Sequence, residues 1–180
     1  MDAAALPPKL MGVHHSAFRC RDAEQTRVFY EEVLGLPLKA ALVIEPGSGP
    51  ASRGAAFLHL FFELKDGNYV AFFDKPDDGT DDKFEMRSPF DLHFAMQAEN
   101  LEELMRFKAH LDAHDIPCFG PIDHHFVKSI YFADPNGLNL EITAREPEHD
   151  AIMADEAATA RDVLATWAQR KAAMQREKAA

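Results

Sequence analysis

Between residues 122 and 141 the chain reads Ile-Asp-His-His-Phe-Val-Lys-Ser-Ile-Tyr-Phe-Ala-Asp-Pro-Asn-Gly-Leu-Asn-Leu-Glu. The four residues Asp134-Pro135-Asn136-Gly137 are typical of a tight turn, because proline fixes its own φ angle and glycine accepts a positive one. Apolar, β-compatible stretches lie on both sides of this turn, at 127–133 and 138–144. The sequence therefore predicts two strands joined by the turn.

The region before this pair of strands follows a regular plan. Residues 90–97 are strand-like, and Asn100 with Glu103 forms a capping-box pattern at the start of a helix with apolar residues at helical spacing. A further strand is predicted near 116–119. The second half of the chain thus has the order strand, helix and three strands.

The first half repeats this order. Asp22 and Gln25 have the capping-box spacing, and the helix that they begin is expected to end at Gly35. His15 and His93 each precede a phenylalanine, Phe29 and Phe107, by fourteen residues. Strands are predicted over 12–20, 38–44, 55–64 and 69–74, the last two joined by a turn at 65–68.

These patterns predict an α+β fold built from two βαβββ modules, at residues 10–75 and 88–145. Residues 146–180 form a third segment, in which 150–178 are rich in Ala, Glu, Lys and Arg and predict a long helix. A partial apolar stripe on this helix is expected to pack on the chain's own body or on a second subunit. Its members are Ile152, Val163, Leu164, Trp167 and Met174.

Three residues on predicted strands, His15, His93 and Glu141, have the chemistry of a metal site. Two imidazoles and one carboxylate form the facial triad, which holds a divalent metal and leaves coordination positions open. Neighbours on a strand point to opposite faces, so only one of His14 and His15 is expected to face the metal.

The segment 122–141 resembles the signature of the extradiol ring-cleaving dioxygenases of the vicinal oxygen chelate superfamily. The matching residues are His124, the pair Ile130-Tyr131, the turn 134–137 and the terminal Glu141. The resemblance implies a curved, barrel-like mixed sheet around one metal, held by His15, His93 and Glu141. It also implies that Tyr131 hydrogen-bonds a substrate hydroxyl oxygen and that His124 donates a hydrogen bond or proton, with His125 as the rival of His124.

The chain departs from the family pattern in three ways. The ring-cleaving enzymes carry four modules, and this chain has room for two. They use a further acid–base histidine, which the matching stretch 67–73 lacks; His59 on the preceding strand is the candidate replacement. Glyoxalase-type relatives use a fourth ligand at about the position of Ala71, which cannot bind metal, so a three-ligand site is expected.

The resemblance implies a non-haem dioxygenase that acts on a catechol-like aromatic, with Fe(II) as the expected metal and Mn(II) or Zn(II) as alternatives. A metal-dependent lyase, isomerase or epimerase on the same scaffold is the second hypothesis. A metal-free binding protein of the bleomycin-resistance type is the third, and the complete triad argues against it. No separate organic cofactor is expected.

The charge and hydrophobicity of the sequence indicate which classes of partner to expect. Lys and Arg number 19 against 30 Asp and Glu, and this net charge of −11 argues against a nucleic-acid or anionic-membrane partner. No apolar stretch is long enough for a membrane helix, and no signal peptide is evident, so a cytoplasmic location is expected. A small-molecule substrate and a homodimer are the expected partners. Cys20 and Cys118 are expected to be reduced.

Other features are expected to have no catalytic role. The glycine-rich loop 45–54 and the acidic segment 74–83 are interpreted as solvated loops, the latter linking the modules, and a lid is the alternative role for 45–54. His110 and His114 have a spacing that could bind zinc, but no third ligand is nearby in the sequence, so a solvated helix face is the better interpretation.

Overall fold

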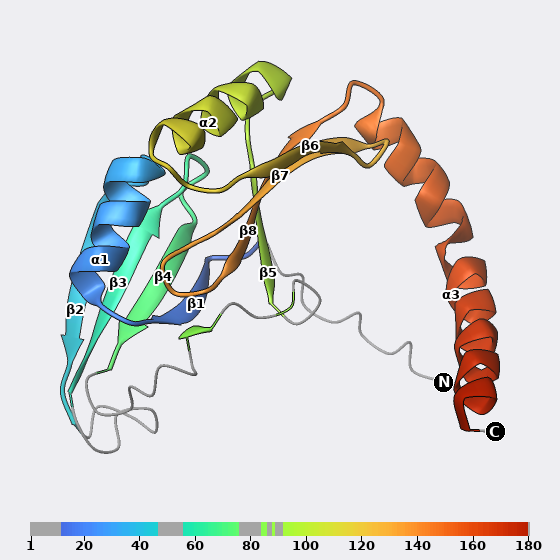
Figure 1. Cartoon of the computed structure of the whole chain (residues 1–180), viewed down its shortest axis with the longest axis horizontal. Helices are drawn as coiled ribbons and strands as arrows, with labels where there is room; N and C mark the ends of the chain where they lie inside the picture. The colour runs from blue at the N-terminus through green and yellow to red at the C-terminus, as the bar shows by residue number, and fades with distance from the viewer. Residues whose placement is uncertain (1–11, 47–55, 76–83, 86–87, 89–91, 180) are drawn as a thin grey trace, which may run out of the picture. The chain divides into compact units, whose positions relative to one another are not determined.

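Two four-stranded sheets with the same internal order form the framework of the structure (Figure 1). The computed structural model describes residues 12–46, 56–75, 84–85, 88 and 92–179. The predicted loops 45–54 and 74–83 therefore fall mostly outside the described residues. The first sheet has the order β1-β4-β3-β2 and the second has the order β5-β8-β7-β6.

In the first sheet, β1 runs parallel to β4, whereas β3 pairs antiparallel with both β2 and β4. Its strands are β1 (His15–Cys20), β2 (Leu38–Ile44), β3 (Phe57–Glu63) and β4 (Tyr69–Asp74). In the second sheet, β6 pairs antiparallel with β7. Its strands are β5 (His93–Gln97), β6 (Phe119–Asp123), β7 (Val127–Ala133) and β8 (Asn139–Arg145). A helix follows the first strand of each set, so the predicted α+β fold of two βαβββ modules is confirmed.

The first helix begins as the sequence predicts and then changes type. Asp22 accepts a hydrogen bond from the Gln25 backbone N–H at 2.7 Å and caps α1 (Ala23–Arg27). The chain continues as a π-helix, η1 (Val28–Val33), rather than as a regular α-helix. Gly35, with φ of +71°, ends it and lets the Leu36 N–H bond to the Tyr30 carbonyl at 2.9 Å.

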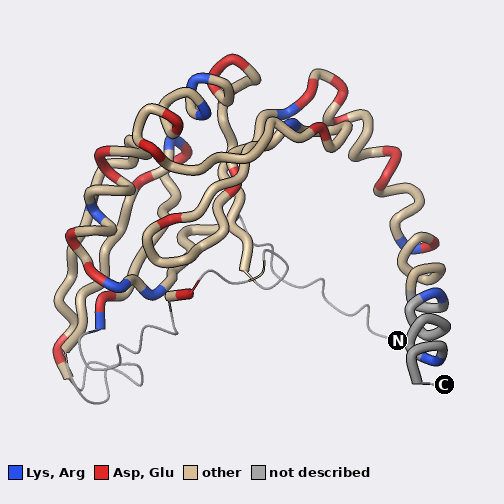
Figure 2. The backbone as a smooth tube through the Cα atoms, in the orientation of Figure 1, with Lys and Arg blue, Asp and Glu red and all other residues tan. Residues whose placement is uncertain are grey.

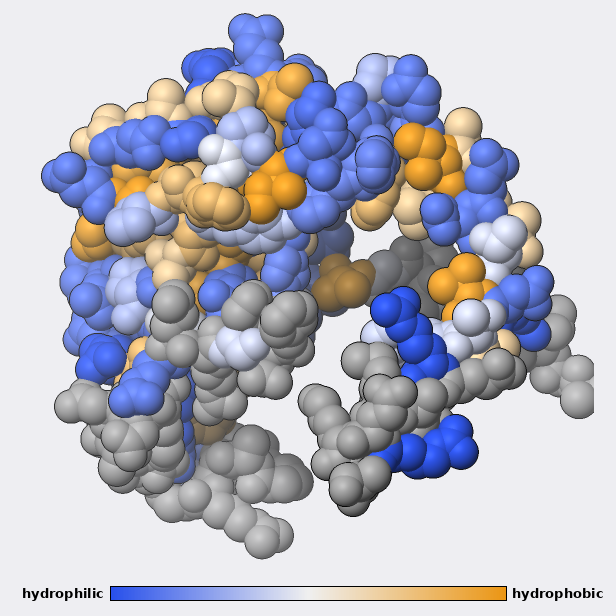
Figure 3. Space-filling view, turned by 45° about the vertical axis from the view of Figure 1, so that its right-hand side comes forward, coloured by the Kyte–Doolittle hydropathy of each residue, from blue (hydrophilic) through white to orange (hydrophobic). Residues whose placement is uncertain are grey.

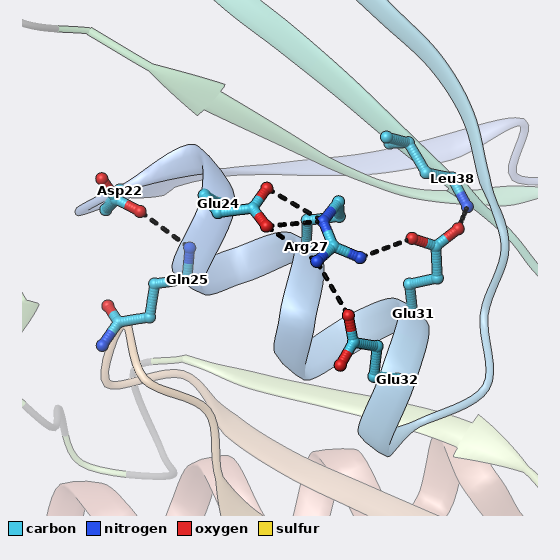
Figure 4. Close-up of polar contacts among 7 residues, drawn as sticks. All are labelled: Asp22, Glu24, Gln25, Arg27, Glu31, Glu32 and Leu38. Atoms are coloured by element: carbon cyan, nitrogen blue, oxygen red, sulfur yellow. Dashed lines mark hydrogen bonds and ion pairs between the residues drawn. The ribbon is translucent and has the colours of Figure 1, made fainter.

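A single arginine links this helical segment into a charge cluster (Figure 4). Arg27 forms ion pairs with Glu24 at 2.7 Å and with Glu31 and Glu32, each at 2.8 Å. The other carboxylate oxygen of Glu31 accepts a hydrogen bond from the Leu38 N–H at 3.2 Å, which connects the cluster to the start of β2. These partly exposed pairs add orientation more than stability.

One face of the first sheet is covered by the helical segment. Tyr30 is fully buried, its ring lies 5.3 Å from that of Phe62 on β3, and it lies 4.7 Å from that of Phe72 on β4. The strand register places the side chains of His15 and Tyr69 on the opposite face. One face of this sheet therefore packs against the helical segment, and the other carries His15 and Tyr69.

The turn predicted at residues 134–137 is present and is held by its own aspartate. Asp134 Oδ1 accepts the backbone N–H groups of Asn136 and Leu138, each at 2.8 Å. Its Oδ2 accepts the Asn136 side-chain amide at 3.0 Å and the Tyr30 hydroxyl at 3.2 Å. Four donors on one buried carboxylate explain why an aspartate is tolerated there.

In the second sheet's module, α2 (Leu101–Ala113) is capped by Asn100, which accepts the Glu103 N–H at 3.0 Å, as predicted. Leu104 and Leu111 on this helix are fully buried. The strand predicted near 116–119 instead spans residues 119–123, as β6. The predicted C-terminal helix is α3 (His149–Ala179).

The chain divides into two compact units, which do not coincide with the sheets at their ends. The first unit comprises residues 1–93 with 133–139, and the second comprises 94–132 with 140–180. The segment boundaries predicted from the sequence remain a prediction. No helix in the described part of the chain combines the length and the hydrophobicity that a membrane crossing requires.

Candidate functional site

A chain of two hydrogen bonds joins three of the residues selected from the sequence. His124 Nε2 lies 2.7 Å from the Tyr131 hydroxyl oxygen, and the Tyr131 hydroxyl donates to Glu141 Oε1 at 3.1 Å. All three residues belong to the second unit. A carboxylate can only accept and a phenol has one proton to give, so His124 Nε2 must donate the bond to Tyr131.

The strand order brings these residues together. Tyr131 is on β7 and Glu141 is on β8, which are neighbours in the second sheet. His124 follows the last residue of β6, and its backbone N–H bonds to the Val127 carbonyl at 2.9 Å in the connection to β7. His125 is exposed, has φ of +71°, and its backbone N–H donates to the side chain of Asp123, at Oδ1, over 2.7 Å. His124, rather than His125, thus contacts Tyr131.

Burial strengthens the preference of Tyr131 for its protonated form. Glu141 is 8% exposed, so its carboxylate lies almost entirely inside the unit. Desolvation raises the pKa of Tyr131, and the negative charge of Glu141 raises it further, against a lowering by Ser129. The phenol therefore keeps its proton at neutral pH and remains a hydrogen-bond donor.

In the first unit, His15 belongs to a group of rings on the face of the sheet opposite the helical segment. Its ring lies 5.4 Å from that of Phe61 and 6.0 Å from that of His59. His14 Nδ1 lies 2.9 Å from His15 Nδ1, so the prediction that these two side chains point to opposite faces is wrong. The reason is that β1 begins at His15, and strand alternation does not extend to His14.

His59 lies on the same face of the sheet as His15. Register pairs His59 with Phe73 and His15 with Tyr69, and the His59 ring stacks on Phe73 at 4.1 Å. Its Nε2 is buried and has no hydrogen-bond partner among the described residues. Desolvation lowers the pKa of His59, with a smaller contribution from His15, so its neutral form is favoured. The contact with Phe73 was missed from the sequence, although the alternation in β4 places Phe73 with Tyr69.

The three proposed metal ligands come from different parts of the structure. His15 and His93 belong to the first unit and Glu141 to the second. His93 is exposed and begins β5, the strand beside β8 in the second sheet. Across the described ranges, no three His, Cys, Asp or Glu side chains are gathered in a geometry that holds a metal ion. The triad remains a prediction.

The donor chemistry of these residues fits a divalent metal. Two imidazoles and one carboxylate match the ligands that Fe(II) and Mn(II) accept. Glu141 already has the hydrogen-bonded support that metal-binding carboxylates require, through Tyr131. Ala71 is fully buried on β4, and its methyl side chain cannot bind a metal. His110 on α2 and His114, the residue that follows this helix, are exposed, and their rings lie 4.3 Å apart.

Comparison with known proteins supplies a family. The family described as "Glyoxalase/Bleomycin resistance protein/Dioxygenase superfamily" matches residues 12–142. No curated protein is similar to the chain in sequence.

Solved structures share the fold at low sequence identity. A glyoxylase/bleomycin resistance protein/dioxygenase domain from Frankia sp. EAN1pec has a TM-score of 0.61 and 17% identity, covering 77% of this chain and 100% of that one. A glyoxalase/dioxygenase from Nostoc punctiforme has a TM-score of 0.58 and 21% identity, and the match covers 81% of this chain and 99% of that one. A third structure is a mutant of the fosfomycin resistance protein FosX from Listeria monocytogenes, complexed with Mn(II) and 1S,2S-dihydroxypropylphosphonic acid. It has a TM-score of 0.55 and 17% identity, and the match covers 79% of this chain and 99% of that one.

Proposed function

The chain belongs to the Glyoxalase/Bleomycin resistance protein/Dioxygenase superfamily, and from this premise we propose that it is an extradiol-type ring-cleaving dioxygenase acting on a catechol-like aromatic. His15, His93 and Glu141 would hold Fe(II). When bound, the metal supplies a positive centre that lowers the pKa of two vicinal substrate hydroxyls and accepts dioxygen. The remaining chemistry is assigned to the side chains described above.

The hydrogen-bond chain from His124 through Tyr131 to Glu141 is the observation that carries the proposal. It connects the two residues proposed for catalysis to a residue proposed as a ligand, over 2.7 and 3.1 Å. A substrate oxygen that approaches Glu141 therefore also approaches a phenolic donor. Because the Tyr131 pKa is raised, that donor stays protonated while the substrate loses its protons.

Tyr131 and His124 have complementary tasks in this proposal. The Tyr131 hydroxyl turns from Glu141 to the anionic substrate oxygen and stabilises its charge, as preorganised donors do in a water-poor site. His124 holds the Tyr131 oxygen from the other side and so fixes the direction in which the phenol points. When the Tyr131 hydroxyl gives its proton to the substrate oxygen, the His124 imidazole can replace that proton along the 2.7 Å contact, which leaves Tyr131 neutral.

The rings on the face of the first sheet opposite the helical segment support an aromatic substrate. Phe61 and Phe73 lie beside His59, at ring distances of 4.2 and 4.1 Å, and Phe61 also contacts His15. Such a surface favours the flat face of an aromatic ring over a strongly hydrated group.

The ion pairs of Lys128 and Arg145, two basic residues of the second unit, argue against an anionic phosphonate as substrate. Lys128 pairs with Glu146 at 2.8 Å, and Arg145 lies 3.6 Å from Asp150, so acidic partners already offset both charges. The phosphonate bound by the FosX mutant is thus a poor guide to the substrate of this chain.

The second candidate is a metal-dependent lyase, isomerase or epimerase that does not consume oxygen. It is favoured by the composition of β4, which has no histidine in its six residues Tyr69–Asp74. His59 on β3 is the replacement proposed for the acid–base histidine, and its Nε2 is buried. Oxygen uptake separates the two candidates.

The test is anaerobic purification with Fe(II), followed by oxygen uptake against a panel of catechols and measurement of metal per chain. Wild type is expected to bind one metal and to give a ring-cleaved product. Glu141→Ala and His93→Ala are expected to lose metal and uptake while keeping their circular dichroism spectra. Glu102→Ala and His110→Ala, exposed residues of α2, are the matched controls and are expected to behave as wild type. Bound metal with no uptake on any catechol would transfer the assignment to the second candidate, and full metal in His93→Ala would overturn the ligand set.

A further inference from the structure

The C-terminal helix α3 carries large apolar side chains on its surface. Met153, Val163, Leu164 and Trp167 are 43%, 60%, 67% and 50% exposed. In the space-filling view, hydrophobic atoms stand among hydrophilic ones along this helix (Figure 3). Exposing a tryptophan and a leucine one turn apart leaves a sizeable apolar area in water, which commonly marks an interaction surface.

The apolar residues follow the spacing of a coiled coil. Met153, Ala157, Ala160, Leu164 and Trp167 are separated by four, three, four and three residues. This is the alternation of a and d positions in a heptad repeat, which places all five side chains on one seam of the helix. The two alanines leave room on the seam, so that a large side chain of a facing helix can fit against them. A second helix is the surface that such a seam matches.

The charges on α3 are divided between its two halves (Figure 2). Residues 149–162 contain four acidic residues and one arginine, whereas residues 163–179 contain four basic residues and one glutamate. Two copies of this helix in parallel would place like charges side by side. Two copies in antiparallel orientation place each acidic half against a basic half.

We propose that α3 is a self-association surface, which pairs antiparallel with α3 of a second copy of this chain. The heptad seam supplies the apolar contact, and the division of charge supplies the orientation. The same helix presents both complementary charges, so a second copy satisfies the pattern without any other partner. This proposal does not depend on the proposed enzymatic function, because it uses no residue of the candidate site.

The first test measures the mass of the full chain by light scattering across a range of concentrations. Leu164→Glu places a carboxylate in the centre of the seam and is expected to weaken association by at least about 100-fold, halving the mass of the assembly. Thr166→Glu adds the same charge two residues away, at an exposed position outside the seam, and is the matched control. It is expected to keep the wild-type mass. A monomeric wild type, or an assembly that Leu164→Glu leaves unchanged, would overturn the proposal.

The second test reads the orientation by energy transfer between dyes. Cys118→Ser removes the partly exposed thiol, and dyes are attached at Ala151→Cys or at Arg176→Cys, near the two ends of α3 and outside the seam. Antiparallel pairing predicts greater transfer between a copy labelled at 151 and one labelled at 176 than between two copies labelled at 151. The opposite order would overturn the antiparallel arrangement. Loss of transfer in Leu164→Glu, with Thr166→Glu unaffected, would tie the signal to the seam.

Discussion

Tyr131 on β7 donates its hydroxyl to Glu141 on β8 over 3.1 Å, and this bond ties the proposed substrate-orienting residue to a proposed metal ligand. A phenol is a hydrogen-bond donor at neutral pH, and burial raises the pKa of Tyr131 further above its ordinary value of 10.0. Ten residues separate them in the sequence, and adjacent strands bring them together.

Tyr131→Phe keeps the ring and removes only this hydroxyl. Loss of one preorganised donor to a developing oxyanion typically lowers kcat by about 100-fold or more. We expect such a loss in oxygen uptake, while the metal content stays at the wild-type value because the three proposed ligands are intact. Metal analysis and steady-state kinetics on the same preparation check this. Wild-type kcat in the variant would remove Tyr131 from the proposed reaction.

His124 and His125 form a natural pair for comparison. His124→Asn shortens the side chain and breaks the 2.7 Å contact with Tyr131. It is expected to lower kcat by about 100-fold, in line with the loss of a positioned proton donor. His125→Asn changes a neighbouring exposed residue, and asparagine tolerates the positive φ angle there. That control is expected to keep wild-type kcat, and the reverse ranking would assign the role to His125.

Local patterns predicted the elements of this fold well. The bounds of β2 and β7 agree with the stretches 38–44 and 127–133, because alternation and turn residues act within a few positions. The strand β6 was placed too early, since Gly120-Pro121 argues against a strand in sequence. Here Gly120 takes a φ of +116°, and pairing of Ile122 with Ser129 extends the strand beyond it.

The candidate site was predictable only in part for a physical reason. His124, Tyr131 and Glu141 lie within eighteen residues of sequence, so one pair of adjacent strands with its connections brings them together. His15 and His93 depend on segments far apart in the chain, whose association is set by packing rather than by local pattern. The ring contact of His59 with Phe73 likewise arises from the pairing of β3 with β4.

Tyr30→Phe tests the buried carboxylate that organises the 134–137 turn. Tyr30 is fully buried and donates to Asp134 Oδ2 at 3.2 Å, so its loss is expected to cost about 1.5–3 kcal/mol in the free energy of unfolding. Tyr69→Phe is the control, because the Tyr69 hydroxyl makes no hydrogen bond among the described residues, and a change below about 0.5 kcal/mol is expected. Urea unfolding of both variants measures the difference. Equal stabilities would show that the Tyr30 hydroxyl contributes nothing to the turn.

The loss of stability in Tyr30→Phe is expected to depend on pH. Burial raises the pKa of Asp134 above its ordinary 3.8, and the hydrogen bond from Tyr30 opposes that rise. A raised carboxyl pKa contributes stability that is present below 3.8 and is lost as pH rises through the folded-state value. Without the Tyr30 hydroxyl the pKa of Asp134 rises further. The difference in free energy of unfolding between wild type and Tyr30→Phe should therefore widen from pH 4 toward neutrality. A gap that stays constant over that range would contradict the assignment.

The buried thiol of Cys20 is expected to lower the free energy of unfolding at alkaline pH. Burial raises the pKa of its thiol from the ordinary 9.0 to about 12, so the folded chain favours the neutral thiol. A raised thiol pKa contributes stability below pH 9 that is lost as pH rises toward 12. Wild type should therefore lose more free energy of unfolding between pH 8 and pH 11 than Cys20→Ala does, since alanine cannot ionise.

Alkylation of the two cysteines by iodoacetamide at pH 8.5 supplies an independent measure of the burial of Cys20, because alkylation requires the thiolate. Desolvation also raises the pKa of Cys118, but its thiol is only partly buried, so Cys118 is expected to react in the folded chain faster than Cys20. Rapid alkylation of Cys20 in the folded chain would contradict its burial.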